Sequence, residues 1–245
     1  MLYGSVSTKG VLSLEYTVIY DDLPSFIEGC ARDFGLSVHI SLGGLSLLFD
    51  TGSRADVLLN NARAAGLDLS EVRLVVVSHP HPDHTGGLKV LATSEPTVYI
   101  PHGQHKGLQE WLGSIGLKDV VVVKGIRELY RGVYVIPFPE SQISEQALLV
   151  ESGSGYTMFV GCSHPGVHYM VGKAVEGGFK VERVVGGLHL SGQPEYKARA
   201  TVMELKRLGV KELLPLHCSG DLVLQYASLL GMLRDRPYLC RTYRA

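Results

Sequence analysis

Short runs of Val, Ile and Leu alternate along the chain with stretches that have the spacing of amphipathic helices. Apolar runs of about four to eight residues are typical of buried strands. The breaks between segments are Gly, Pro or Asp, which favour turns. The pattern therefore predicts an α/β fold.

In the first half, two glycines at Gly43-Gly44 predict a tight hairpin turn, because glycine readily adopts positive φ. The expected helices are Arg54–Ala65 and Gly107–Ile115. The expected strands are Leu14–Tyr20, Ser37–Leu42, Leu45–Phe49, Val72–Ser78, Thr97–Ile100, Val120–Val123 and Val133–Ile136.

The second half repeats this order of elements and again begins with a hairpin. Its expected strands are Gln146–Glu151, Tyr156–Val160, Val181–Val185 and Glu212–Leu216, and its expected helices are Val167–Glu176, Glu195–Leu208 and Leu222–Leu233. In this repeat Asp50 corresponds to the turn at 162–164, His79 to His189, and His102 to His217. If the two halves pack sheet to sheet, these strand ends meet at one edge, where α/β sheets bind ligands. We expect one domain over residues 1–245.

The composition is that of a compact protein, with 45% hydrophobic and 19% charged residues. The net charge of −1 gives no field that would attract nucleic acid or an anionic membrane. We therefore expect a small-molecule substrate, and the sequence does not indicate an oligomeric state. Because no apolar run suits a signal peptide or a membrane span, we expect a cytoplasmic protein.

The four cysteines, Cys30, Cys162, Cys218 and Cys240, lie far apart, with no CxxC pair. Without a secretory context, this spacing predicts no disulfide framework. Two of them lie next to histidines in short motifs.

The densest chemical signal is the segment 79–84, which holds three histidines and an aspartate and follows a Val-rich strand. In an extended loop His79 and His81 share one side, while Asp83 and His84 are free to turn towards a neighbouring point. Imidazole suits zinc, iron, manganese or nickel, and a nearby carboxylate favours a hydrolytic site over a structural one. The segment therefore predicts two adjacent metal positions.

This H-x-H-x-D-H pattern resembles the metallo-β-lactamase superfamily, whose fold is an αββα sandwich of two pseudo-equivalent halves. The resemblance implies that His79 and His81 bind a first metal and that Asp83 and His84 bind a second. It also implies that His217, at the end of a strand, is the last metal ligand. For the Asp at position 50, a group that braces the ligand loop and a plain turn-forming residue remain equal alternatives.

The turn Gly161-Cys162-Ser163-His164 lacks the Asp that most of the superfamily has there. Either His164 or Cys162 then supplies the ligand, and we favour His164 because a thiolate bridge suits few hydrolytic sites. His189 follows Gly186-Gly187 and is a candidate ligand, a catalytic group beside the substrate, or an orienting hydrogen-bond partner.

Further motifs resemble those of one subgroup of this superfamily. The subgroup includes dihydropterin ribofuranosylaminobenzene phosphate synthase-like proteins and many uncharacterised hydrolases. These motifs are Phe49–Gly52, Thr85–Leu88, Gly161–Gly166, Gly186–Leu190 and His217–Gly220. The subgroup says little about the substrate, because one fold carries many reactions.

The resemblance implies a hydrolase that holds two divalent transition-metal ions, with zinc the first choice and manganese or iron the alternatives. We expect metal-activated water to attack an ester or phosphoester of a small metabolite, with Asp83 orienting the nucleophile and His189 protonating the leaving group. One alternative is a pterin-directed C–N bond-forming transferase of tetrahydromethanopterin biosynthesis. The others are a di-iron redox protein and a non-catalytic metal-binding protein.

Overall fold

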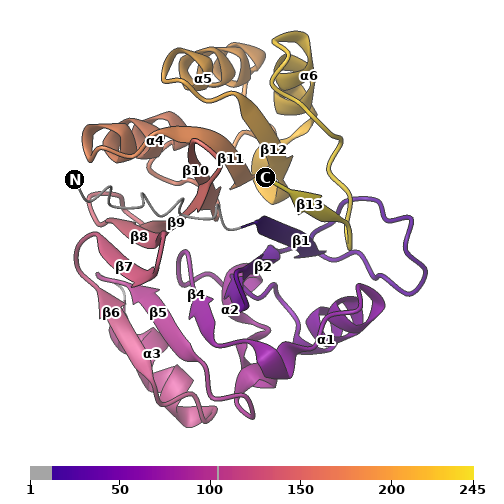
Figure 1. Cartoon of the computed structure of the whole chain (residues 1–245), viewed down its shortest axis with the longest axis vertical. Coiled ribbons are helices and arrows are strands. Elements are labelled where there is room, and N and C mark those ends of the chain that lie inside the picture. The colour runs from indigo at the N-terminus through magenta and orange to yellow at the C-terminus, as the bar shows by residue number, and fades with distance from the viewer. Residues whose placement is uncertain (1–12, 104) are drawn as a thin grey trace, which may run out of the picture.

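The computed structural model describes residues 13–103 and 105–245, which form two mixed β-sheets packed face to face (Figure 1). The first sheet has the order β13-β1-β2-β3-β4-β5-β6 and the second the order β12-β11-β10-β9-β8-β7. The first contains β1 (Leu14–Tyr20), β2 (Ser37–Leu42), β3 (Leu45–Phe49), β4 (Leu74–Val76), β5 (Thr97–Pro101), β6 (Val120–Val123) and β13 (Thr242–Arg244). The second contains β7 (Arg127–Tyr130), β8 (Val133–Phe138), β9 (Glu145–Ser152), β10 (Gly155–Val160), β11 (Val181–Gly187) and β12 (Glu212–Leu216).

Helices cover the outer faces of both sheets (Figure 1). The α-helices are α1 (Ala55–Ala64), α2 (Pro82–Thr85), α3 (His105–Ser114), α4 (Val167–Glu176), α5 (Glu195–Arg207) and α6 (Asp221–Leu229). Short 3₁₀ helices lie at Leu69–Glu71, Leu88–Leu91 and His217–Ser219. None of the helices in the described ranges combines the length and apolarity needed to cross a bilayer.

Three apolar layers hold the sandwich together. Phe49 and Phe159 belong to the central layer between the sheets. Leu58 and Leu112 belong to the layer that joins the first sheet to α1 and α3. Val202 belongs to the layer between the second sheet and α4, α5 and α6. All of these side chains are almost completely buried, so the hydrophobic effect fixes the order helix, sheet, sheet, helix.

The two halves share one scheme of strand pairing. In the first, β1–β2 and β2–β3 are antiparallel, and β3–β4 and β4–β5 are parallel. In the second, β8–β9 and β9–β10 are antiparallel, and β10–β11 and β11–β12 are parallel. The predicted αββα sandwich of two pseudo-equivalent halves is confirmed, and so is the hairpin at Gly43-Gly44, where both glycines have positive φ.

Cys30 and Cys240 form a disulfide, so the expectation of no disulfide was wrong for this pair. The two residues lie 210 positions apart in the sequence, a separation that reveals no pairing by itself. The antiparallel pairing of β13 with β1 brings the C-terminal segment back, and the backbone N–H of Cys240 donates to Val18 O at 2.7 Å. Cys162 and Cys218 are free.

Candidate metal centre

The histidine loop leaves the end of β4 and runs into the short helix α2. His81 has an extended backbone and caps the helix, whose first residue is Pro82. The helix carries Asp83 and His84, and His84 Nε2 lies 3.4 Å from Asp83 Oδ2. His79 Nε2 lies 3.0 Å from His81 Nδ1, and the His79 and His84 ring centroids are 4.1 Å apart. The four predicted ligands of this loop therefore gather in one place.

Asp50 braces this loop from the end of β3. Its buried carboxylate accepts hydrogen bonds from Ser78 N at 2.6 Å, Ser78 Oγ at 2.7 Å and His84 Nδ1 at 2.7 Å. Burial alone lowers the pKa of His84, but the charge of Asp50 outweighs it and raises that pKa to about 10. These contacts favour the bracing role over a plain turn residue, because they leave His84 Nε2 facing the centre.

The second sheet supplies a matching brace, Glu145 at the start of β9. This fully buried carboxylate accepts from the backbone N–H groups of Cys162 at 3.0 Å, Ser163 at 2.8 Å and His164 at 2.8 Å. It also accepts from His164 Nδ1 at 2.9 Å. One side chain thus fixes both the turn after β10 and the orientation of the His164 ring.

Cys162 belongs to three groups of potential ligands in the described residues. Its Sγ is 3.3 Å from His84 Nε2. The first group comprises Asp83, His84, Cys162 and His217, the second His79, Cys162 and His164, and the third Cys162, His189 and Cys218. In each group the ligand atoms lie within 4.8 Å of one another. The ring of His81 borders the second group, with centroids 4.6 Å from His79 and 5.2 Å from His164. Both Cys162 and His164 therefore reach the centre.

His217 carries the clearest sign that these residues fit a metal ion. Its backbone N–H donates to Asp21 Oδ2 at 2.8 Å, and its Nε2 lies 3.2 Å from Asp83 Oδ2. Both ring nitrogens are buried, and neither forms a hydrogen bond within the described residues, although Nε2 has the ion-pair contact with Asp83. Buried polar atoms are normally bonded, and a metal at Nε2 would supply the missing partner. The nitrogen, oxygen and sulfur donors suit a divalent transition metal.

For His79 and Asp83 the electrostatics favour the protonation states that metal binding requires, whereas His84, with its raised pKa, must lose a proton before Nε2 can bind a metal. Burial, reinforced by the charges of His84 and His164, lowers the pKa of His79, so its ring is neutral. Burial acts to raise the pKa of Asp83, but the neighbouring His217 and His84 outweigh it and lower that pKa overall. Neutral imidazole and ionised carboxylate are the ligand forms of these residues.

Backbone strain is concentrated around the centre. In the described chain six non-glycine residues have positive φ, and four of them follow strands that end here. These four are Asp50, Ser163, His189 and His217, with φ between 49° and 61°. Such conformations cost energy and persist where the surroundings enforce them. The fold thus turns sharply at each strand end to direct side chains to one point.

His189 lies at the rim of the cluster. Its ring centroid is 4.9 Å from that of His164, and burial lowers its pKa. It borders a pocket of about 340 Å³ between the centre and α5, lined also by Leu190, Tyr196 and Lys197. His189 groups with Cys162 and Cys218 rather than with the other predicted ligands. His102, at the end of β5, belongs to none of the ligand groups found in the described residues.

Sequence reasoning missed Glu145 and Asp21, which orient the site without any motif. Glu145 is the first residue of a buried strand and is completely buried. A charged residue two positions ahead of the apolar run 147–150 was the available signal. Asp21 follows β1 and gives no signal, because its partner His217 lies 196 positions away.

The sequence of this chain is similar to those of known proteins. Residues 32–177 match the profile of the Metallo-beta-lactamase superfamily. A relative from Methanocaldococcus jannaschii is 27% identical over 240 residues, covering 76% of this chain and 81% of the relative. Its name is 7,8-dihydropterin-6-methyl-4-(beta-D-ribofuranosyl)-aminobenzene-5'-phosphate synthase.

Solved structures share the fold. A metal-dependent hydrolase of the beta-lactamase superfamily aligns with a TM-score of 0.76 at 24% identity, covering 95% of this chain and 99% of that one. The metallo-beta-lactamase fold protein YhfI from Bacillus subtilis aligns with a TM-score of 0.64 at 14% identity, covering 95% and 100%. The profile match spans more than half of the sequence, and the chain belongs to the metallo-beta-lactamase superfamily.

Proposed function

We propose that the protein is a metal-dependent hydrolase that acts on a phosphoester of a small metabolite. One observation carries the proposal: two groups of potential ligands meet at Cys162 and adjoin a pocket at His189. A purely structural metal site would be closed on all sides by protein ligands. Here a substrate in the pocket would lie directly beside the ligands.

The proposed metal content is two divalent ions, with zinc first and manganese or iron as alternatives. His79, His81 and His164 would hold one ion, and Asp83, His84 and His217 the other, with Cys162 facing both. When bound, such ions activate water as a nucleophile and polarise a phosphoryl oxygen.

Two side chains of the protein would then orient the attacking water and protonate the leaving group. We assign to Asp83 the orientation of the attacking water, because its carboxylate remains ionised beside His84 and His217. We assign to His189 the protonation of the leaving group. Burial lowers its pKa, which makes its protonated form a stronger acid, and its exposed position lets it exchange protons with solvent.

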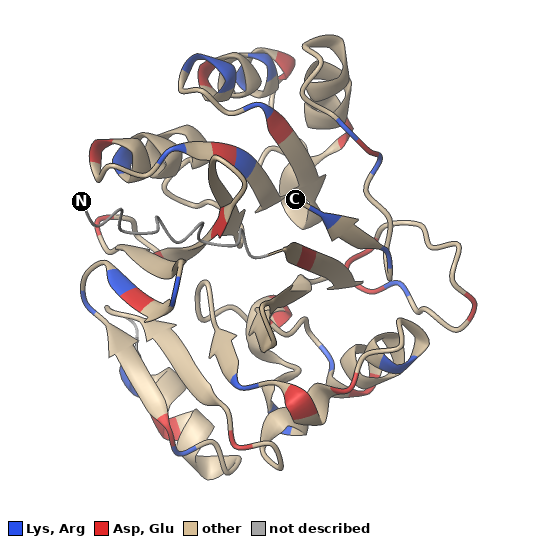
Figure 2. Cartoon of the chain, viewed as in Figure 1, with Lys and Arg blue, Asp and Glu red and all other residues tan. Residues whose placement is uncertain are grey.

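The pocket beside His189 supports a substrate with an apolar part and a negative charge. Its walls include Val167, Leu188 and Leu190, whereas Lys197 supplies a cation from α5. Over the rest of the molecule Lys and Arg are mixed with Asp and Glu in both halves (Figure 2). That mixture and the net charge of −1 support a small-molecule substrate rather than nucleic acid.

A second candidate is a pterin-directed C–N bond-forming transferase. The observation that favours it is the similarity to the Methanocaldococcus jannaschii synthase, whose name includes a pterin and a 5'-phosphate. Both candidates use the same metal centre and a phosphorylated ligand. Mass spectrometry distinguishes them, because a transferase joins two substrates whereas a hydrolase consumes water.

The test measures hydrolysis of generic phosphodiester, phosphomonoester and thioester substrates before and after chelation. We expect chelation to abolish hydrolysis of a phosphoester and added metal to restore it. Asp83→Ala should lose turnover while remaining folded, and Asp56→Ala, which removes an exposed carboxylate on α1, should remain as active as wild type. A metal-loaded D83A enzyme with wild-type turnover would show that the role given to Asp83 is wrong.

A further inference from the structure

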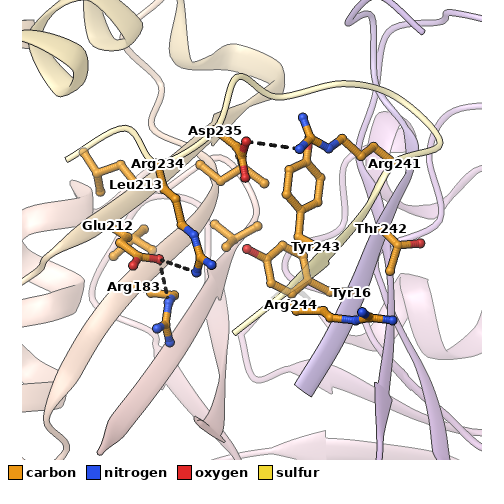
Figure 3. Close-up of a pocket in the computed structure, with 13 residues that line it drawn as sticks. Tyr16, Arg183, Glu212, Leu213, Arg234, Asp235, Arg241, Thr242, Tyr243 and Arg244 are labelled. Atoms are coloured by element: carbon orange, nitrogen blue, oxygen red, sulfur yellow. Dashed lines mark hydrogen bonds and ion pairs between the residues drawn. The ribbon is translucent and has the colours of Figure 1, made fainter. Parts of the chain in front are cut away.

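A second pocket lies between the two sheets, at the opposite end of the strands from the metal centre. Arg183 and Glu212 pair near the starts of β11 and β12, whereas His189 and His217 follow the ends of the same strands. The pocket has a volume of about 220 Å³. Figure 3 shows Arg183 and Arg234 on one side and Tyr243 and Arg241 on the other.

Positive charge exceeds negative charge in this pocket. Its lining includes four arginines but only two carboxylates, Glu212 and Asp235. Arg183 Nε binds Glu212 Oε2 at 2.7 Å, and Arg241 binds Asp235 at 3.1 Å (Figure 3). A third arginine of the lining, Arg244, forms its ion pair with Glu15, which lies outside the pocket.

Among these four arginines, Arg234 is the one to which the described residues offer no close partner. Its ion-pair contact, to the same Glu212 oxygen, is 3.9 Å long, and 61% of its side chain is exposed. Because Glu212 already pairs closely with Arg183, one guanidinium is left to bind an external anion.

Tyr16 provides an independent sign of a ligand. The residue is 94% buried in the sandwich, being only 6% exposed, and no described residue forms a hydrogen bond with its hydroxyl. Arg183, Glu212 and Arg234 are the charged groups around this phenol, and burial raises its pKa, so the hydroxyl remains protonated and can donate. The oxygen is not among the fully buried polar atoms that lack a partner, so it keeps contact with the open pocket, where a ligand can accept from it.

The remaining walls would accept a planar organic group. Tyr243 stacks on Tyr16 with ring centroids 5.5 Å apart and an interplanar angle of 17°. The Arg241 guanidinium lies 5.1 Å from the Tyr243 ring centroid, and Val184 and Leu213 add apolar surface. Guanidinium groups and a hydroxyl donor suit phosphate oxygens, while the tyrosine edges and the apolar side chains suit contact with a ligand ring.

We propose that this pocket is a second ligand site that binds an aromatic phosphomonoester, with Arg234 and Tyr16 donating to the phosphate. The site is separate from the metal centre and from the reaction proposed for it. Its occupancy therefore does not depend on the groups that hold the metal ions.

The test is calorimetric titration of the full-length, metal-loaded protein with phenylphosphonate, a phosphate analogue that hydrolysis does not cleave. We expect saturable binding at this pocket in addition to binding at the metal centre, with the dissociation constant of the pocket raised about tenfold or more by Arg234→Gln and by Tyr16→Phe. Tyr16→Phe retains the stacked ring, and Arg234 is largely exposed, so both variants should fold.

Two controls locate the binding. Arg207→Gln removes an exposed arginine that pairs with Glu204 on α5 and should leave the affinity unchanged. His217→Ala alters the metal centre and should also leave it unchanged. Absence of saturable binding would overturn the proposal. So would binding that is lost in His217→Ala but unaffected by both pocket variants, because this result places the ligand at the metal centre.

Discussion

Two histidines of the centre are each held by a buried carboxylate from another strand end. Asp50 accepts from Nδ1 of His84, and Glu145 accepts from Nδ1 of His164. In both cases Nε2 is left free to face the ligand cluster. Such outer contacts fix ring orientation and increase the basicity of a metal ligand.

Because Glu145 holds the His164 ring in place, replacing Glu145 should lower the affinity of the protein for metal. Glu145→Gln replaces a carboxylate that accepts four hydrogen bonds with an amide that has one oxygen, so the turn and the His164 ring lose their fixed orientation. We expect metal affinity to fall about 10- to 100-fold in competition with a chelator. Glu151→Gln, an exposed change on the same strand, is the control, and equal affinities for the two variants would refute the brace.

The buried His39 predicts a dependence of stability on pH. Burial lowers its pKa to about 4, compared with about 6.5 in the unfolded chain. The unfolded state then binds more protons between these values, so stability is complete above about pH 6.5 and falls as the pH drops towards 4. The loss attributable to this residue is at most about 3 kcal/mol.

Denaturant unfolding of wild type and His39→Gln from pH 4 to 8 measures this effect. Glutamine can still reach Ser46, the hydrogen-bond partner of His39 Nε2 at 2.9 Å. The difference in unfolding free energy between the two proteins should change over this pH interval. A constant difference would mean that His39 titrates normally in the folded protein.

At the scale of single residues, the sequence predicted the site residues that lie within a local motif. The ligands at 79–84 are close in the sequence, and His217 follows a clear strand. The central position of Cys162 was only an alternative, because its distance from His84 depends on how the sheets meet. The ligand assignments themselves remain predictions.

Among the elements, long apolar runs were predicted well and short edge strands were missed. β7 is largely exposed, and β13 has only three residues, so neither carries a hydrophobic pattern. Each forms by pairing with a neighbouring strand, β7 with β8 and β13 with β1. Of the predicted strand Val72–Ser78, only Leu74–Val76 pairs as β4.

The disulfide joins the segment after β1 to the segment before β13. It closes a loop with a sequence separation of 210 residues, so its loss should enlarge the conformational entropy of the unfolded chain. Replacing Cys30 and Cys240 together with serine should lower the free energy of unfolding by about 2–4 kcal/mol. Equal denaturation curves for the variant and for oxidised wild type would contradict this expectation.

The disulfide between Cys30 and Cys240 is relevant to the expected cytoplasmic location, which remains a prediction. Disulfides are rare in cytosolic proteins outside hyperthermophiles. Alkylation of free thiols at cell lysis, followed by mass spectrometry, shows whether Cys30 and Cys240 are oxidised in the cell. Under denaturing conditions the free cysteines Cys162 and Cys218 are alkylated in either case.

At the scale of the whole molecule, the centre exists only where the two halves meet. The first half supplies His79, His81, Asp83 and His84, and the second supplies Cys162, His164 and His217. Metal binding should therefore stabilise the packing of one sheet on the other, and chelation should lower the melting temperature. The repeat made this convergence predictable, because matching strand ends carry the polar residues.

Elemental analysis of the purified protein tests the central claim most directly, with phosphoester hydrolysis measured on the same sample before and after chelation. We predict two transition-metal ions per chain and hydrolysis that chelation abolishes. A protein that binds no metal under any loading condition would contradict the metal centre, and two bound ions without hydrolysis would contradict the proposed reaction.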